Sequence, residues 1–423
     1  MRNTGHPAGS WYAATADLGP PRPRLTGAVK ADVCVIGAGF TGLGAALELA
    51  RRGARVVVLE AATVGSGGTG RNGGQVHPGQ RREQDWLERV VGVEDARRLW
   101  TLAEEARANL HALIGEIDCD WRPGLIQARH RPAGGEEEAV YAALMAERYG
   151  YPLLEVVDRE RMGQLLGTDV YHGGLIDHGG GHVHPLKLAL GMARLAEAAG
   201  AAICEQSRVT AIDGLTVRTE GGSVACQRIV LSGDGYMDGL APALEARVMP
   251  INNFIAVTEP LDDGPEGVGI LPSDMAAADS RFVIRYWRKT PDGRLLFGGG
   301  ENYTPWFPSD IAGFVRRHML GTYPQLAGAK ITHAWGGTLG VTVKRLPYVG
   351  EPLPGVLAAT GYSGQGVMLA PYFGKLLAQA ALGEAAMLEP LKRLPSPAFP
   401  GGKWLRWPAL AAGMSWYALR DRL

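Results

Sequence analysis

The run Gly37-Ala38-Gly39-Phe40-Thr41-Gly42 constrains the fold of this chain more than any other feature. It lies between "ADVCVI", which has the composition of a buried strand, and "FTGLGAALELARRG", which has the length and apolar spacing of a helix. Gly37 permits a tight turn, Gly39 lets a pyrophosphate approach the backbone, and Gly42 permits close packing of the helix on the strand. The pattern predicts a Rossmann-like turn whose helix N-terminus, with Phe40 and Thr41, faces a phosphate group.

A second strand, "ARVVVLE" (54–60), ends in an acidic residue, Glu60. A carboxylate at this position accepts hydrogen bonds from both hydroxyls of a ribose. It also repels a 2′-phosphate, so the sequence favours FAD or NAD over NADP.

The run "GTGRNGGQ" (68–75) separates FAD from NAD, because a flavin needs contacts from several distant segments. Gly73 and Gly74 would let the backbone reach the isoalloxazine edge. Arg71 could neutralise phosphate or ribityl oxygens, and Asn72 and Gln75 could add hydrogen bonds. The alternative is a plain glycine loop in which Arg71 is solvated.

The run "GYSGQGV" (361–367) lies between an apolar strand and a helix, so its backbone amides should surround a helix N-terminus. Reduced flavin carries negative charge over N1 and O2, which such a terminus stabilises. Val209 in "SRVTAID" and Gly233 in "RIVLSGDG" could contact the adenine end. In the run 361–367, the residues expected to contact the cofactor are Gly361, Tyr362, Gly364, Gln365, Gly366 and Val367.

The composition excludes several classes of protein. The 43 basic and 43 acidic residues cancel, which argues against nucleic-acid binding. The four cysteines are far apart, as in a reduced cytoplasmic protein, and no stretch approaches 18 apolar residues. His182 and His184 lack further metal ligands nearby, so no metal site is predicted.

At 423 residues the chain exceeds what one core usually serves. Helix–strand alternation at both ends, with alternating residues at 251–258, 281–288 and 294–300 between them, predicts an α/β fold. In it, a Rossmann-like FAD-binding domain is interleaved with an α+β substrate domain built on an antiparallel sheet. The expected segments are an N-terminal arm (1–30), FAD-binding parts (31–115, 171–240, 335–385), substrate parts (116–170, 241–334) and a C-terminal tail (386–423).

These runs, in this order with "GGHVHPLKLALGMARLAEAAG", "RLLFGGG" and "WGGTLGVTVKRLPYVG", resemble the D-amino-acid-oxidase-type FAD oxidoreductases. Within that group the chain is most similar to the γ-glutamylputrescine oxidoreductase branch. The resemblance implies oxidation of the C–N bond of an amine by hydride transfer to flavin N5, then imine hydrolysis and re-oxidation by oxygen or another acceptor. It also implies non-covalent FAD, since no cysteine lies near 335–350; a histidyl link through His77 stays open.

The catalytic candidates are Tyr286, Trp335 and Lys344. Tyr286 and Trp287 alternate on a predicted strand, so one of them could face the flavin. Trp335 precedes two glycines and is expected near the ring. Many relatives carry an acid after the threonine of a "T-x-D-x-x-P" stretch, where this chain reads "TVKRLP". Lys344 or Arg345 is therefore expected to place positive charge near flavin or substrate, unless both are solvated.

Arg285 and His77 are the candidate substrate-binding residues, Arg285 for a carboxylate. The expected partners are a small-molecule amine and oxygen or another electron acceptor, with the oligomeric state open. The aromatic and basic tail is expected to dock on the protein's own body, or else on a membrane surface. Two other functions remain: a D-amino acid or glycine-type dehydrogenase, and a non-catalytic flavoprotein assembly factor.

Overall fold

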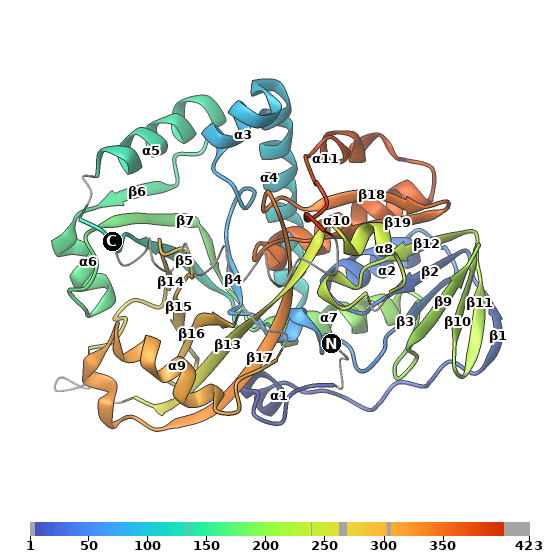
Figure 1. The fold of residues 1–423 in the computed structure, drawn as a ribbon, viewed down its shortest axis with the longest axis horizontal. Coiled ribbons are helices and arrows are strands. Elements are labelled where there is room, and N and C mark those ends of the chain that lie inside the picture. Colours follow the sequence, from blue (N-terminus) through green and yellow to red (C-terminus); the bar gives the residue numbers. More distant parts are fainter. Residues whose placement is uncertain (1–4, 133–134, 238, 262–268, 303–305, 402–423) are drawn as a thin grey trace.

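The computed structural model describes residues 5–132, 135–237, 239–261, 269–302 and 306–401 (Figure 1). The aromatic and basic part of the predicted tail lies outside the described residues. In the described part, no helix is both long and apolar enough to cross a bilayer.

A six-stranded sheet forms one half of the molecule (Figure 1). Its neighbouring strands are parallel, except that β18 and β19 are antiparallel. The apolar runs of β2, β3 and β19 are buried throughout, as expected for strands covered on both faces. The strands, in sheet order, are β18 (Tyr348–Leu353), β19 (Val356–Thr360), β12 (Arg228–Leu231), β2 (Val33–Ile36), β3 (Val56–Leu59) and β8 (Ala202–Cys204).

Helices α2 (Phe40–Arg51) and α10 (Gly366–Ala381) pack against each other almost backbone to backbone. A Cβ atom at Gly44 would collide with the carbonyl of Pro371, and one at Gly374 with the carbonyl of Thr41. The contact holds the N-termini of two helices, from opposite ends of the chain, beside one cavity. Helices α3 (Gln84–Val91), α4 (Val93–Glu116) and α7 (Pro185–Ala198) complete this half, and α3 and α4 are separated at Gly92, whose φ is 84°.

A nine-stranded, mainly antiparallel sheet forms the other half. A second core beneath it contains Trp287, Phe297 and Tyr323 and is covered by α9 (Ile311–Leu320). The strands, in order, are β17 (Ile331–Thr342), β13 (Val248–Pro260), β16 (Arg294–Asn302), β15 (Tyr286–Lys289), β14 (Ala276–Asp279), β5 (Arg122–Ala128), β7 (Gly174–His182) and β4 (Gln75–Val76), with β6 (Leu154–Val157) paired to β7.

Smaller elements complete the described chain. A four-stranded sheet is formed by β1 (Gly27–Lys30), β11 (Gly222–Ala225), β10 (Thr216–Thr219) and β9 (Val209–Asp213). The helices α1 (Trp11–Thr15), α5 (Glu136–Tyr149), α6 (Arg159–Leu166), α8 (Pro242–Glu245) and α11 (Glu389–Lys392) and the short 3-10 helices η1 (Gly68–Gly70), η2 (Asp234–Tyr236), η3 (Pro324–Gly328) and η4 (Ala386–Leu388) lie between strands or at the ends.

The fold class predicted from the sequence is confirmed, but local details differ. Strands β8 and β9 follow each other closely in sequence but join different sheets, and Gln206 between them takes a φ of 51°. Strand β7 pairs in the nine-stranded sheet although it lies within a predicted FAD-binding segment, and β17 crosses the predicted boundary at 334/335. The domain boundaries themselves stay predictions.

Candidate active site

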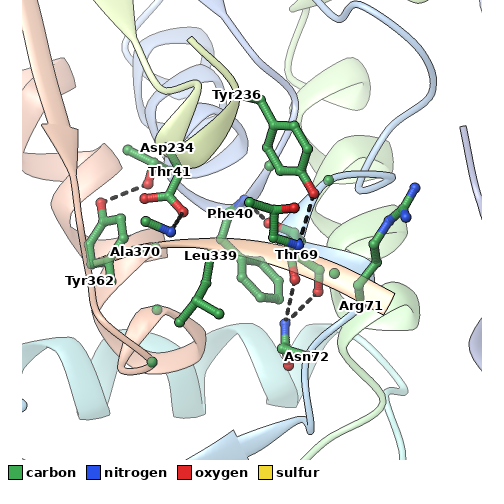
Figure 2. A pocket seen from close by; sticks show the side chains of 18 of the residues that line it. Phe40, Thr41, Thr69, Arg71, Asn72, Asp234, Tyr236, Leu339, Tyr362 and Ala370 are labelled. Carbon is green, nitrogen blue, oxygen red and sulfur yellow. Dashed lines mark hydrogen bonds between the residues drawn. The ribbon is translucent and has the colours of Figure 1, made fainter. Parts of the chain in front are cut away.

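A cavity of about 370 Å³ is lined by both large sheets (Figure 2). One wall comes from the ends of β2, β3 and β12 and the first turn of α2. The other comes from β13, β15 and β17. The predicted site residues that line it are Gly37, Gly39, Phe40, Thr41, Glu60, Arg71, Asn72, Gly73, Gln75, His77, Val209, Gly233, Tyr286, Tyr362, Gly364, Gln365, Gly366 and Val367.

The glycine turn before α2 is shaped as the motif requires. Gly37 has a φ of 101°, and a Cβ atom at Gly42 would collide with the carbonyl of Gly37. Gly42 therefore lets helix and strand approach without lining the cavity itself. The Thr69 hydroxyl accepts a hydrogen bond from the Phe40 N–H at 3.1 Å, and a Cβ at Gly39 would lie 2.9 Å from it. Other amides of the first helical turn have no partner inside the helix and are available to an anion.

Glu60 both shapes this turn and faces the cavity. Its Oε2 accepts the Ala38 N–H and its Oε1 accepts the Ala62 N–H, each at 2.9 Å. Burial raises the pKa of Glu60, and the two amide hydrogen bonds oppose that rise. Each oxygen keeps further acceptor capacity, so the carboxylate can also bind two ribose hydroxyls.

Arg71 lines the cavity, but its guanidinium donates to backbone carbonyls. Nη2 donates to Gly5 at 2.6 Å, Nε to Ser66 at 2.7 Å and Nη1 to Gly336 at 3.1 Å. The side chain thus ties the N-terminal arm and β17 to the loop. The role predicted for it toward phosphate or ribityl oxygens stays a prediction.

Asn72 and Gln75 also serve the loop itself. Asn72 Nδ2 donates to the carbonyls of Gly68 and Thr69 (Figure 2), and its Oδ1 accepts the Gly74 N–H at 2.7 Å. Gln75 Nε2 donates to the Ala277 carbonyl at 2.7 Å. Because these amide groups are engaged within the protein, the hydrogen bonds expected from them to the cofactor have no support in this geometry.

Gly74 has a φ of 75° and does not line the cavity. A Cβ there would collide with the carbonyl of Val183, whose N–H is bonded to the Gly74 carbonyl at 2.9 Å. The glycine is required by packing against the segment before α7. Gly73, by contrast, lies on the cavity wall against the ring of Tyr286.

Asp234 fastens the glycine turn before α10, and it is a residue that sequence reasoning missed (Figure 2). Its Oδ1 accepts the Gly361 N–H at 2.9 Å and the Thr360 hydroxyl at 3.1 Å, while Oδ2 accepts the Gly340 N–H at 2.8 Å. Gly361 accordingly does not line the cavity. The available signal was an acidic residue directly after the buried strand "RIVLSG".

Tyr286 stands on the cavity wall and Trp287 does not, as strand alternation predicted for the pair. The Tyr286 hydroxyl donates to Asn253 Oδ1 at 2.5 Å, and both residues line the cavity. Trp287 is fully buried in the second core, stacked between Tyr171 and Phe297. Asn253 was not predicted, because nothing in its strand distinguishes it from other polar positions.

Three of the predicted catalytic and substrate-binding residues do not line the cavity. Trp335 is 1% exposed, and its Nε1 donates to the Arg71 carbonyl at 3.2 Å, behind the loop. Lys344 is exposed, and its carbonyl accepts a hydrogen bond from Arg82. Arg285 turns toward the end of α9, where Nη1 donates to the Thr322 hydroxyl at 3.2 Å. The roles expected of these three stay predictions, and residue type alone does not reveal on which side of its backbone a side chain lies.

Arg345 is the member of the basic pair that lines the cavity. It lines the cavity with a φ of 58°, and its guanidinium lies 4.4 Å from the centre of the Phe282 ring. Arg81 also lines the cavity and donates to the Ser363 carbonyl at 3.0 Å. The neighbouring Arg82 donates to the Lys344 carbonyl, so the loop that carries Arg81 adjoins the loop that carries Arg345.

His77 is a neutral imidazole beside these arginines. Burial, assisted by the positive charge of Arg81, lowers the pKa of His77 to about 3. Its Nε2 lies 3.2 Å from Gln75 Oε1, an acceptor whose orientation is fixed by the bond from Gln75 Nε2 to Ala277. Nε2 therefore carries the proton, which leaves Nδ1 as an acceptor.

Residues 32–380 match the family model described as DAO, FAD dependent oxidoreductase. The chain belongs to this family. It is 44% identical, over 98% of both chains, to the probable oxidoreductase OrdL of Rhizobium meliloti (strain 1021). It is 37% identical, again over 98% of both, to gamma-glutamylputrescine oxidoreductase of Escherichia coli (strain K12). The crystal structure of glycine oxidase from Geobacillus kaustophilus has the same fold, with a TM-score of 0.70 at 21% identity over 87% of this chain and all of that one.

FAD is therefore the cofactor of this enzyme, as predicted. The residues present fit it: the glycine turn excludes side chains where a pyrophosphate would lie, and Glu60 can accept ribose hydroxyls. No cysteine of the described chain lines the cavity, which agrees with non-covalent binding.

Proposed function

We propose that this enzyme oxidises the C–N bond of an amine that also carries a carboxylate, either a γ-glutamyl-amine or an N-substituted amino acid. Relatives named as gamma-glutamylputrescine oxidoreductase, glycine oxidase and sarcosine oxidase subunit support the amine class. The observation that carries the carboxylate is the position of Arg345 on the cavity wall, on a loop adjoining that of Arg81.

The charges of the cavity lining favour an anionic substrate group. The carboxylates among its described lining residues are those of Glu60 and Asp234. Both accept backbone amides, Glu60 at the turn before α2 and Asp234 from β17 and the turn before α10. Arg345 is thus a cation facing a cavity whose acids are engaged elsewhere. Its planar fork can bind a carboxylate through two parallel hydrogen bonds, and a net contribution of about 1.5–3 kcal/mol is typical of a hydrogen bond to a charged group. Its left-handed backbone, costly for a non-glycine residue, is the kind of strain that functional sites retain.

The same cations serve the chemistry. When bound, FAD accepts a hydride at N5 from the carbon next to the substrate nitrogen, which requires that nitrogen to be unprotonated. Positive charge from Arg81 and Arg345 disfavours an ammonium group and lowers the pKa of a bound amine. The Tyr286 hydroxyl donates to Asn253, and its oxygen is of a kind that can accept an amine N–H. The neutral His77 provides a second acceptor through Nδ1.

The proposal is tested with a pair of substrates and a pair of variants. The substrates are a carboxylated amine that bleaches the flavin and its analogue with the carboxylate converted to an amide. The variants are Arg345→Met and Lys344→Met, which remove adjacent cations of which only Arg345 lines the cavity. Dissociation constants come from anaerobic flavin reduction in a stopped-flow instrument.

We expect Arg345→Met to weaken binding of the carboxylated amine by roughly 10- to 100-fold and to change binding of the amide analogue much less. Arg345→Lys should recover part of the loss, because it restores charge without the fork. Lys344→Met should match the wild type in both reduction and re-oxidation. Equal losses for both substrates, or none, in Arg345→Met would contradict the proposal.

A further inference from the structure

Three consecutive backbone carbonyls of the loop 68–75 accept hydrogen bonds from buried side chains that do not line the cavity. The Arg71 carbonyl accepts Trp335 Nε1 at 3.2 Å, the Asn72 carbonyl accepts the Tyr12 hydroxyl at 2.9 Å, and the Gly73 carbonyl accepts Arg288 Nε at 3.0 Å. The donors come from β17, α1 and β15, and each is at most 1% exposed. We call Tyr12, Arg288 and Trp335 the carbonyl bracket.

The bracket residues also fix one another. Arg288 Nη2 donates to the Tyr12 oxygen at 3.2 Å, and since arginine cannot accept, the Tyr12 proton is directed to Asn72. The Tyr12 ring packs edge-on against Trp335, with ring centres 5.1 Å apart. Burial raises the pKa of Tyr12, which keeps the donor proton in place. The remaining Arg288 bond goes to the Lys289 carbonyl, so no carboxylate of the described chain neutralises its charge.

The N–H groups of the same loop differ from its carbonyls in their hydrogen bonding. In the part of the chain that the structure describes, the N–H groups of Asn72 and Gly73 have no acceptor, whereas the Gly74 N–H is bonded to Asn72 Oδ1. Asn72 and Gly73 both line the cavity, beside Tyr286. Unpaired amides at a buried site are costly unless a ligand accepts from them.

The geometry points to the carbonyl bracket as a set of positioning residues for the flavin. By holding three carbonyls away, it presents the amides of Asn72 and Gly73 as donors to the electron-rich edge of the isoalloxazine ring. The positive charge of Arg288 behind the Gly73 peptide favours the electron-rich reduced ring over the oxidised one. The bracket thereby sets the reduction potential of the flavin, and the N-terminal arm contributes to it through Tyr12. This inference rests on FAD binding alone and holds for any substrate.

The competing explanation is that the bracket only anchors the N-terminal arm. Two variants of equal chemistry separate the explanations: Tyr12→Phe and Tyr323→Phe each remove a hydroxyl that donates to a buried carbonyl. Tyr323 makes its bond to Leu166 at 2.8 Å in the second core, and it does not line the cavity. Both variants should lower the stability of the protein by similar amounts.

The measurement is the two-electron potential of the holoenzyme against a reference dye under anaerobic conditions, with the FAD dissociation constant in parallel. We expect Arg288→Met to lower the preference for reduced over oxidised flavin about tenfold, which is about 30 mV. Arg288→Lys should retain part of the potential. Tyr12→Phe should shift it in the same direction and weaken FAD binding, while Tyr323→Phe should leave both at wild-type values.

If Arg288→Met fails to fold, the Tyr12→Phe and Arg288→Lys variants decide the question. The inference would be overturned by two results together. Tyr12→Phe would have to leave both the potential and the FAD affinity unchanged, and Arg288→Lys and any folded Arg288→Met protein would have to leave the potential unchanged. The amine specificity of the enzyme plays no part in this readout. Its failure is therefore distinguishable from failure of the proposed function.

Discussion

The hydroxyl oxygen of Thr41 lies 2.7 Å from the phenolic oxygen of Tyr362, at a sequence separation of 321 residues. Thr41 belongs to the first turn of α2, and Tyr362 to the glycine turn before α10 (Figure 2). Because both residues line the cavity, this bond sets the spacing between the motif that binds the pyrophosphate and the turn expected beside the ring. It thereby joins two parts of the expected cofactor site that are far apart in the sequence.

A double-mutant cycle measures what this bond contributes. Tyr362→Phe and Thr41→Val each remove one partner, and we expect each to lower the free energy of unfolding by about 1 kcal/mol, because a buried polar atom loses its partner. The double variant should cost less than the sum of the two single variants. Strict additivity in denaturant unfolding would show that the two hydroxyls do not stabilise each other.

Glu60→Arg should yield mostly apoprotein. The substitution removes the acceptor for the Ala38 and Ala62 amides as well as the ribose acceptor, and it introduces a donor. Glu60→Gln retains one acceptor oxygen and should keep more FAD, with weakened affinity. The ratio of flavin to protein absorbance after gel filtration gives the occupancy. Full FAD occupancy in Glu60→Arg would show that Glu60 is not required for FAD binding.

Gly74→Val should lower both flavin content and stability, because the new side chain would collide with the Val183 carbonyl. Gly53→Val is a matched control: its φ of 80° is similarly left-handed, but a Cβ there has nothing within 4 Å. The control should show only the backbone cost of about 1 kcal/mol and bind FAD normally. If both variants behave alike in thermal unfolding and FAD content, contact with Val183 is not what requires glycine at position 74.

The stability of the fold should fall below about pH 6.5, and His182 and His184 are two of the buried histidines that contribute to this fall. Burial, with positive charge from Arg288, lowers the pKa values of His182 and His184 to about 3. The unfolded chain, with ordinary histidine pKa values near 6.5, takes up these protons first as the pH falls. Each histidine therefore lowers the free energy of unfolding by up to about 1.4 kcal/mol per pH unit between pH 6.5 and 3.

His184→Asn tests this assignment. His184 caps α7 by accepting the Lys187 N–H through Nδ1, and asparagine can also cap a helix but does not titrate. The variant should lose stability at all pH values, since it gives up ring contacts with Trp11 and Tyr12. Its pH slope between 6.5 and 3 should decrease by one proton. An unchanged slope would place the titrating group elsewhere.

Local motifs were predictable from the sequence, and distant packing was not. The glycine turn at Gly37 and the acid at Glu60 are recognisable because few residues satisfy their backbone and charge requirements. The glycine at position 74 was recognised as special, but the reason is a contact with Val183, more than 100 residues away in sequence. Tyr12, in an arm of irregular composition, carries no local signal of its contact with the loop.

The same limit explains why some of the predicted site residues do not line the cavity. The side chains of Trp335 and Arg285 lie away from the cavity because β17 and the start of β15 turn them toward Tyr12 and Thr322. Lys344 and Arg345 are adjacent in the chain, yet only Arg345 lines the cavity, through the left-handed backbone of its turn. Such choices depend on tertiary packing, which periodicity in a single sequence does not specify.

The most direct test of the proposed function is anaerobic reduction of the wild-type flavin by a panel of amines, followed by admission of air. The panel contains γ-glutamyl-amines, N-alkyl amino acids, D-amino acids, glycine and uncharged amines of similar size. The account predicts bleaching by a γ-glutamyl-amine or an N-substituted amino acid, none by the matched uncharged amine, and recovery of colour with an acceptor. Bleaching by D-amino acids or glycine alone, equal bleaching by uncharged amines, or a bound flavin that no amine reduces would contradict it.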